Sequence, residues 1–222
     1  AVDGLRRAKL GGIGNLVARA LLSSTRNRSQ ERLALAFDEV GGAFETEWTS
    51  DFTVVSAITT KAHFDDAINT LTDVLLNAEF DPAIVKRTQE AYLADIKRSG
   101  DDVASLAYLQ LLEALYKDSP YRRPKLGSAL SVSRLTRDDL LAFYQKFYTP
   151  SNMVVSVAGD VTNEQVLERL KKAFAGTGDP VKVPQRPFVD ESLTQSVTRI
   201  SEKDISAAYI VMGFLAPGIR NT

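Results

Sequence analysis

The sequence predicts an α+β fold, in which an antiparallel sheet has helices packed on one face. Helical spacing of apolar residues dominates the chain. The alternating segments do not follow helices at regular intervals, as they would in a parallel, doubly wound sheet. Two alternating segments, 42–49 and 51–60, follow each other directly, which is typical of a β-hairpin. A buried core is expected, since 44% of the 222 residues are hydrophobic.

The helices follow in chain order from periodicity and capping residues. Residues 12–23 place Leu16, Val17, Ala20 and Leu21 on one apolar face. Residues that cap later helices at their starts, or stop them, are Ser29, Gly41, Thr136 with Asp139, and Thr162 with Gln165. These later helices are expected over about 29–40, 61–77, 81–98, 101–116, 136–147 and 162–174.

Three segments in the second half of the chain read as further strands. The stretch "NMVVSVAGDV" (152–161) is expected to be a buried strand, and 195–201 and 207–217 are expected to be two more. The segment 117–134 is rich in Pro, Gly, Ser and Arg and is expected to be a loop.

A break in the pattern suggests how the chain is organised. Residues 1–175 are expected to form one domain. A Pro- and Gly-rich linker follows at 176–187. Residues 188–222 would then supply strands that extend the sheet or begin a second domain.

Charge and residue counts exclude several functions. A formal charge of -1 argues against nucleic-acid binding. Without cysteine there are no disulfides, thiolate metal sites or cysteine nucleophiles. The single histidine, His63, rules out a two-histidine metal site within this chain, and its place at a helix start favours a partly exposed residue without a catalytic role.

The membrane and the compartment can be addressed from the same sequence. No apolar run reaches the roughly 20 residues that a membrane-spanning helix needs, so no membrane span is expected. No signal peptide heads the sequence, and the localisation stays unknown, with a periplasmic or cell-envelope location compatible.

Five stretches, in this order along the chain, resemble the M16 family of zinc metallopeptidases. That family includes pitrilysin, the mitochondrial processing peptidase and the core subunits of the cytochrome bc1 complex. The stretches are "GGIGNLVARALLSSTRNRSQ", "DEVGGAFETEWTSDFTVV", "AEFDPAIVKRTQEAYLADIKR", "SPYRRPKLGS" and "LLAFYQKFYTPSNMVVSVAGDV". The resemblance covers about 12–175 and continues weakly to the end, and it implies a LuxS/MPP-like α+β domain.

The first stretch departs from the family's inverted zinc motif, H-x-x-E-H. The resemblance puts Asn15 at the first ligand histidine, Ala18 at the general-base glutamate and Arg19 at the second histidine. Without the resemblance, residues 12–22 read as an ordinary packed amphipathic helix.

The family's third ligand, a glutamate, lies on a later helix. The closest position here is Asp95, or Ala94 if the register shifts by one. Thr88 stands seven residues before Asp95, where the resemblance implies a helper glutamate.

The chemistry of these residues predicts that the zinc site is lost. Asn is a poor zinc ligand, Arg is a permanent cation, and Ala18 cannot accept a proton from water. We therefore expect no zinc or other cofactor and no peptidase activity. We also expect Arg19 to form a salt bridge with Asp95 in place of the metal, since an unpaired buried carboxylate is costly. The alternative is that both side chains reach solvent separately.

The resemblance implies assemblies built from active and inactive units. We therefore expect a non-catalytic partner, or a chamber-forming scaffold, of an active M16 peptidase subunit or domain, with a homo-oligomer left open. The alternative is a structural core-type subunit of a larger complex without a proteolytic role.

Substrate-binding residues are only weakly indicated. Family peptidases bind substrate as an added strand, and the corresponding segment "GAFETEWT" makes Phe44, Glu45 and Thr46 weak candidates. The plainer interpretation is a half-exposed strand with Phe44, Thr46 and Trp48 on one face. The arginines of the "YRRP" loop lie at the wrong place in the family pattern, and no site role is assigned to them.

Overall fold

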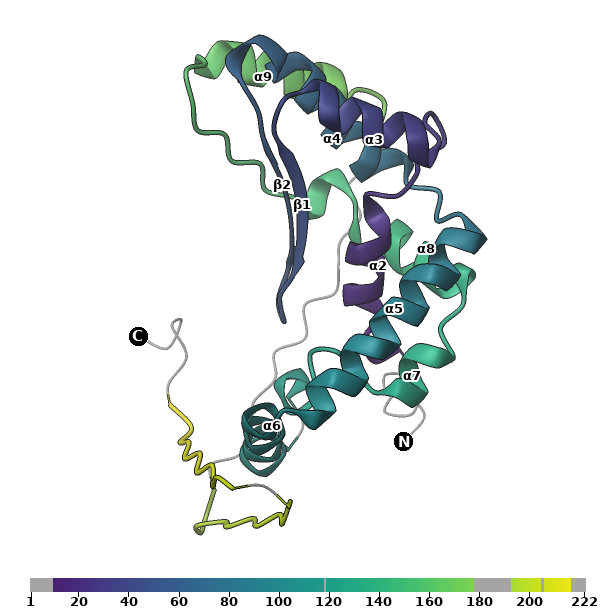
Figure 1. The fold of residues 1–222 in the computed structure, drawn as a ribbon. Helices are drawn as coiled ribbons and strands as arrows, with labels where there is room; N and C mark the ends of the chain where they lie inside the picture. The colour runs from purple at the N-terminus through teal and green to yellow at the C-terminus, as the bar shows by residue number, and fades with distance from the viewer. Residues whose placement is uncertain (1–9, 118, 178–192, 205, 217–222) are drawn as a thin grey trace.

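The computed structural model describes residues 10–117, 119–177, 193–204 and 206–216 (Figure 1). The α-helices are α2 (Ile13–Leu21), α3 (Gln30–Glu39), α4 (Phe64–Asn77), α5 (Pro82–Asp101), α6 (Val103–Leu115), α7 (Ala129–Ser133), α8 (Arg137–Phe147) and α9 (Asn163–Ala173). The strands are β1 (Ala43–Trp48) and β2 (Thr53–Ile58), and short 3-10 helices are η1 (Lys61–His63), η2 (Pro120–Arg122) and η3 (Pro150–Asn152). In Figure 1, α3, α4 and α9 gather at one end of the hairpin, α5 runs past α2, and α6 and α7 lie beyond the level of the hairpin's other end.

Helix α2 is the centre of the core. Every residue of α2 except Arg19 is buried, and the helix contacts β1, α5 and α8. Its N-cap residue, Gly12, has a φ of 85°. A Cβ atom at this position would lie 2.8 Å from the carbonyl oxygen of Leu126. A glycine is therefore required where α2 begins. The fully buried large side chains include Tyr92, Phe80, Leu16, Leu21, Leu33 and Leu140.

The two strands form an antiparallel hairpin in which Glu45 lies opposite Ser56. The side chains of Phe44, Thr46 and Trp48 are half-buried, and their neighbours along β1 are exposed. The half-buried face contacts α2 and α3. Helices thus cover one face of an antiparallel sheet, and the expected α+β class is confirmed.

The capping residues predicted from the sequence do cap helices. Thr136 with Asp139 and Thr162 with Gln165 form capping boxes at the starts of α8 and α9, and Ser29 caps α3. Each cap satisfies backbone N–H groups that have no partner within the helix. Among the helices in the described ranges, none has the length and apolar character to cross a membrane.

The three additional strands predicted from the sequence are wrong within the described residues. Residues 153–158 lack the pairing of a strand, and Val154 is 97% exposed instead of buried. The segments 193–204 and 206–216 likewise contain no paired strand. A strand exists only where its backbone N–H and C=O groups bond to a neighbouring strand, and polar–apolar alternation does not supply that neighbour.

Two helix assignments also differ from the expectation. Helix α7 lies within the segment expected to be a loop, because Ser128 and Ser131 form a capping box there. Helix α5 continues to Asp101, three residues beyond the expected end. Most of the expected linker, from residue 178 onward, lies outside the described residues, and the division into domains stays a prediction.

Candidate functional site

The contact between α2 and α5 brings together three of the residues singled out from the sequence. The Arg19 Nη1 atom donates to Asp95 Oδ2 at 2.5 Å, and Arg19 Nε donates to Asn15 Oδ1 at 2.9 Å. The predicted Arg19–Asp95 salt bridge is confirmed. Asn15 and Arg19 are one helical turn apart, so both side chains project from one side of α2.

Two further side chains complete this Arg19–Asp95 cluster. Arg98, one turn after Asp95 on α5, donates to the second carboxylate oxygen. The guanidinium of Arg19 also lies over the ring of Tyr92, 4.5 Å from its centroid. One carboxylate is therefore held between two cations, and one of these cations is also held by an aromatic ring.

The ion pairs shift the ionisation of the cluster. Hydrogen bonds from the guanidinium groups of Arg19 and then Arg98 lower the pKa of Asp95 below its ordinary value. Burial raises the pKa of Tyr92, whose hydroxyl donates to the Leu126 carbonyl at 2.8 Å. At neutral pH the cluster therefore consists of a carboxylate, two guanidinium groups and a neutral phenol.

These residues do not fit a catalytic zinc ion. Zinc in a catalytic site needs three imidazole or carboxylate ligands and an open position. The amide oxygen of Asn15 and both oxygens of Asp95 already accept hydrogen bonds from guanidinium groups. Ala18 is buried and has no polar side-chain atom. Within the described ranges, no group of three or more His, Cys, Asp or Glu side chains could hold a metal ion.

The two candidate positions on α5 differ in their surroundings. Asp95 faces Arg19, whereas Ala94 is exposed. Thr88 is half-buried, two helical turns before Asp95. How these residues correspond to the family's ligand positions stays a prediction.

Two of the three candidates on β1, Phe44 and Thr46, pack against neighbouring helices. Phe44 stacks on Phe37 of α3 with ring centroids 4.3 Å apart, and the Thr46 hydroxyl donates to the Ala18 carbonyl at 2.9 Å. Glu45 is exposed on the opposite face. These contacts fix β1 on α2 and α3, and a role in substrate binding stays a prediction.

The other residues considered from the sequence lie away from the Arg19–Asp95 cluster. His63 is 44% exposed and lies 3.5 Å from Asp66, one turn along. Arg122 donates to the Lys117 carbonyl at 3.2 Å, and Arg123 is exposed. None of these contacts assembles a catalytic group.

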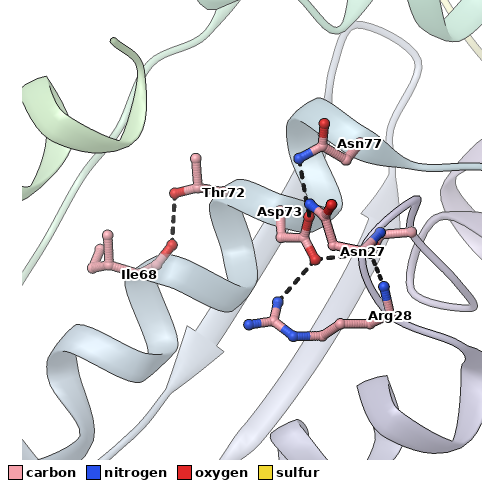
Figure 2. A network of polar contacts seen from close by, with 7 residues as sticks. Asn27, Arg28, Ile68, Thr72, Asp73 and Asn77 are labelled. Atoms are coloured by element: carbon pink, nitrogen blue, oxygen red, sulfur yellow. Dashed lines mark hydrogen bonds and ion pairs between the residues drawn. The ribbon is translucent and has the colours of Figure 1, made fainter.

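A second polar cluster, centred on Asp73 of α4, was missed from the sequence (Figure 2). Its carboxylate is 8% exposed, and four donors surround it. The Thr25 hydroxyl (2.8 Å) and Arg28 Nη1 (2.9 Å) donate to Oδ2, and the side-chain amides of Asn27 (2.6 Å) and Asn77 (2.9 Å) donate to Oδ1. The cluster ties the loop between α2 and α3 to α4.

The Asp73 cluster borders an open depression of about 440 Å³. Because each carboxylate oxygen already accepts two hydrogen bonds, the cluster acts as a structural anchor. One signal in the sequence could have found it. A carboxylate within the otherwise uncharged run "TLTDVLL" needs hydrogen-bond donors if it is buried, and the loop "STRNR" offers them.

Two protein-family models together match most of the chain. A family model described as insulinase (peptidase family M16) matches residues 7–129, and a model described as the peptidase M16 inactive domain matches residues 134–222. An uncharacterized zinc protease of Rickettsia felis is 28% identical over 206 residues, which are 91% of this chain and 48% of that protein. The chain spans about half the length of the curated relatives it matches.

Solved structures share the fold. A peptidase M16 inactive domain from Pseudomonas fluorescens aligns with a TM-score of 0.73 and 22% identity, and a protease from Helicobacter pylori aligns with a TM-score of 0.76 and 20% identity. Each alignment covers 82% of this chain and 45% of the other. Because the insulinase model matches more than half of the sequence, the chain belongs to peptidase family M16.

Proposed function

We propose that the chain is a catalytically inactive M16-type domain that serves as a non-catalytic partner, or a chamber-forming scaffold, of an active M16 peptidase. It binds no zinc and hydrolyses no peptide. Its contribution is a rigid surface next to the partner's catalytic chamber.

The observation that carries the proposal is the Arg19–Asp95 ion pair between α2 and α5. A guanidinium group occupies the side of α2 on which the resemblance would place the family's ligands, and it neutralises the Asp95 carboxylate. A cation fixed there repels a second cation, and Ala18 offers no general base. The match of residues 134–222 to the model described as the peptidase M16 inactive domain supports the family, whereas Arg19 and Asp95 lie in the part of the chain that the insulinase model matches.

The second candidate function is a structural core-type subunit of a larger complex without any proteolytic role. The lack of a fitting zinc site is compatible with both functions. The two candidates differ in whether the chain changes the activity of another peptidase.

The first experiment measures zinc and hydrolysis. The purified chain should contain substoichiometric zinc by elemental analysis and should not cleave a mixed peptide library. The matched variant Asn15→His/Ala18→Glu/Arg19→His/Asp95→Glu restores a ligand set on the same fold and should gain zinc. Stoichiometric zinc in the wild-type chain, lost on Asn15→Ala and Asp95→Ala, would refute the inactivity.

The second experiment tests the partner role. The chain is mixed with an M16 peptidase from the same genome that carries an intact H-x-x-E-H motif, and hydrolysis is followed as the chain is titrated. A saturable rise in kcat or a fall in KM supports the partner function. Unchanged kinetics, with the chain recovered in a large complex lacking that peptidase, would favour the structural function instead.

A further inference from the structure

The Arg19–Asp95 cluster holds more positive than negative charge. Arg19 and Arg98 both donate to the carboxylate of Asp95. Among the described residues, no other carboxylate forms an ion pair with either guanidinium group. Tyr92 adds no negative charge at neutral pH, because burial raises the pKa of its hydroxyl. The cluster therefore keeps one positive charge that its own residues do not neutralise.

Both guanidinium groups also have hydrogen-bond donors left over. A guanidinium group carries five N–H donors in a planar fork. Within the described ranges, Arg19 uses one donor on Nε and one on Nη1, and Arg98 uses one on Nη2. The Arg98 side chain is 78% exposed and that of Arg19 is 35% exposed. The two side chains can therefore donate to a further anion while they keep Asp95.

The cluster itself shows which anion its geometry fits. Asp95 places one carboxylate oxygen on each of the two guanidinium groups. Planar guanidinium groups match the two oxygens of a carboxylate better than a point charge does. Arg19 is held in one orientation by Asn15 and by the ring of Tyr92, so it loses little side-chain freedom when it binds a ligand.

A basic segment lies next to the cluster. The Tyr92 hydroxyl donates to the Leu126 carbonyl at 2.8 Å, which ties residues 122–126 to the cluster. The segment reads "RRPKL" and contains no acidic residue, although the whole chain has a formal charge of -1. Its exposed cations are Arg122, Arg123 and Lys125. Asp51, which accepts a hydrogen bond from Tyr121, neutralises only part of this charge. The remaining charge makes the local potential attractive to anions.

We propose that the Arg19–Asp95 cluster binds a carboxylate group of a peptide, either an acidic side chain or a free C-terminus, with Arg98 as its main contact. Peptides are the class of ligand that fits a chain of a peptidase family, and the formal charge of -1 does not favour a nucleic acid. The inference rests on the proposed function, because it names the kind of peptide that the non-catalytic surface would hold.

The test is an NMR titration of the isotope-labelled chain with three short peptides. The first has capped ends and a central glutamate, and the second has a glutamine in its place. The third carries the glutamine and a free C-terminal carboxylate. We expect at least one of the two carboxylate peptides to bind about fivefold more tightly than the capped glutamine peptide, as one charge-assisted contact at a solvated site allows. The tighter of the two identifies the source of the carboxylate, and the Nε–Hε signals of Arg19 and Arg98 should shift.

Two substitutions separate recognition from a structural role. Arg98→Gln removes the surplus charge and leaves the Arg19–Asp95 pair, so it should abolish the preference for a carboxylate peptide. Asp95→Asn removes the internal carboxylate that competes for the same donors, so it should tighten binding, which loss of a merely structural contact would not do. The matched control is Arg32→Gln at an exposed arginine of α3, which should leave binding unchanged.

Equal binding of all three peptides, or the same effect of Arg98→Gln and Arg32→Gln, overturns the proposal. Far-UV circular dichroism checks the fold of each variant, and the wild-type comparison of the three peptides needs no variant. The titration contains no second peptidase. Its failure would therefore leave the proposed function to the zinc and partner experiments, whose failure would in turn leave the peptide preference measurable.

Discussion

Arg19 and Asp95 are 76 residues apart in the sequence, and their charged groups meet at 2.5 Å across the contact between α2 and α5. Arg19 is the exception to the burial of α2, and it lies over the ring of Tyr92. Both charged side chains keep partial access to solvent, at 35% for Arg19 and 26% for Asp95. The ion pair therefore joins α2 and α5 at the edge of the core, where solvent screening weakens the attraction between the two charges.

The Arg19–Asp95 pair should contribute measurably but modestly to stability. In a double-mutant cycle with Arg19→Met and Asp95→Asn, we expect a coupling energy of about 1 kcal/mol from urea unfolding, because both groups are partly solvated. The control pair is Arg98 with Asp95, where Arg98 is 78% exposed and the coupling should be smaller. A coupling near zero for Arg19 would show that the contact does not stabilise the fold.

The lowered pKa of Asp95 predicts how this contribution changes with pH. A carboxyl whose pKa is depressed in the folded state stabilises the protein above its unfolded pKa of about 3.9, and this stability is lost as the pH falls through the folded pKa. The stability difference between wild type and Asp95→Asn should therefore be full at neutral pH and shrink in acid.

Carboxyl carbon chemical shifts measure this pKa directly. The titration midpoint of Asp95 should lie below about 3.9 in the wild type. It should rise in Arg19→Met, because the hydrogen bond from Arg19 is the largest cause of the lowered pKa of Asp95. A midpoint that is the same in both proteins would contradict this assignment.

Asp73 should matter more for stability than any exposed carboxylate on the same helix. Asp73→Ala leaves the buried Thr25 hydroxyl, and the side-chain amides of the exposed Asn27 and the half-buried Asn77, without their acceptor, which should cost about 2–4 kcal/mol in the free energy of unfolding. The matched control on α4 is Asp65→Ala. Asp65 pairs with Arg169 at 2.6 Å, but its side chain is 50% exposed.

The control substitution at Asp65 should cost less than about 1 kcal/mol, since surface ion pairs contribute little. Urea unfolding of both variants measures the difference. Equal costs for the two substitutions would mean that the buried network does not anchor the α2–α3 loop to α4.

The sequence predicts local features of this protein better than contacts between distant residues. The caps at Ser29, Thr136 and Thr162 depend on neighbours three residues away, and they are visible in the sequence. The Asp73 cluster joins residues more than 40 positions apart, which no local pattern reveals. The Arg19–Asp95 pair was predictable only because the family resemblance relates two helices that are distant in sequence.

The strand predictions failed for a related reason. Alternation identified the hairpin because β1 and β2 are adjacent in the sequence and supply each other's hydrogen bonds. The valine-rich stretch 153–158 has the composition of a strand, but no segment adjacent in sequence pairs with it, and among the described residues it forms no strand. Side-chain pattern therefore indicates strand propensity, and the partner decides whether a strand forms.

The docking of β1 on α2 gives a last prediction, from the two glycines within helices α2 and α5. A Cβ atom at Gly14 would lie 2.1 Å from the Trp48 ring, so Gly14→Ala should destabilise the fold by about 1–3 kcal/mol through overpacking. The matched substitution is Gly100→Ala in α5, where a Cβ atom would have no neighbour within 4 Å. It should stabilise the fold by up to about 1 kcal/mol, because alanine is the better helix former. Urea unfolding measures both changes, and Trp48→Leu in the Gly14→Ala background should recover part of the loss by making room. If both alanine variants shift stability in the same direction, the hairpin does not rest on α2 through this contact.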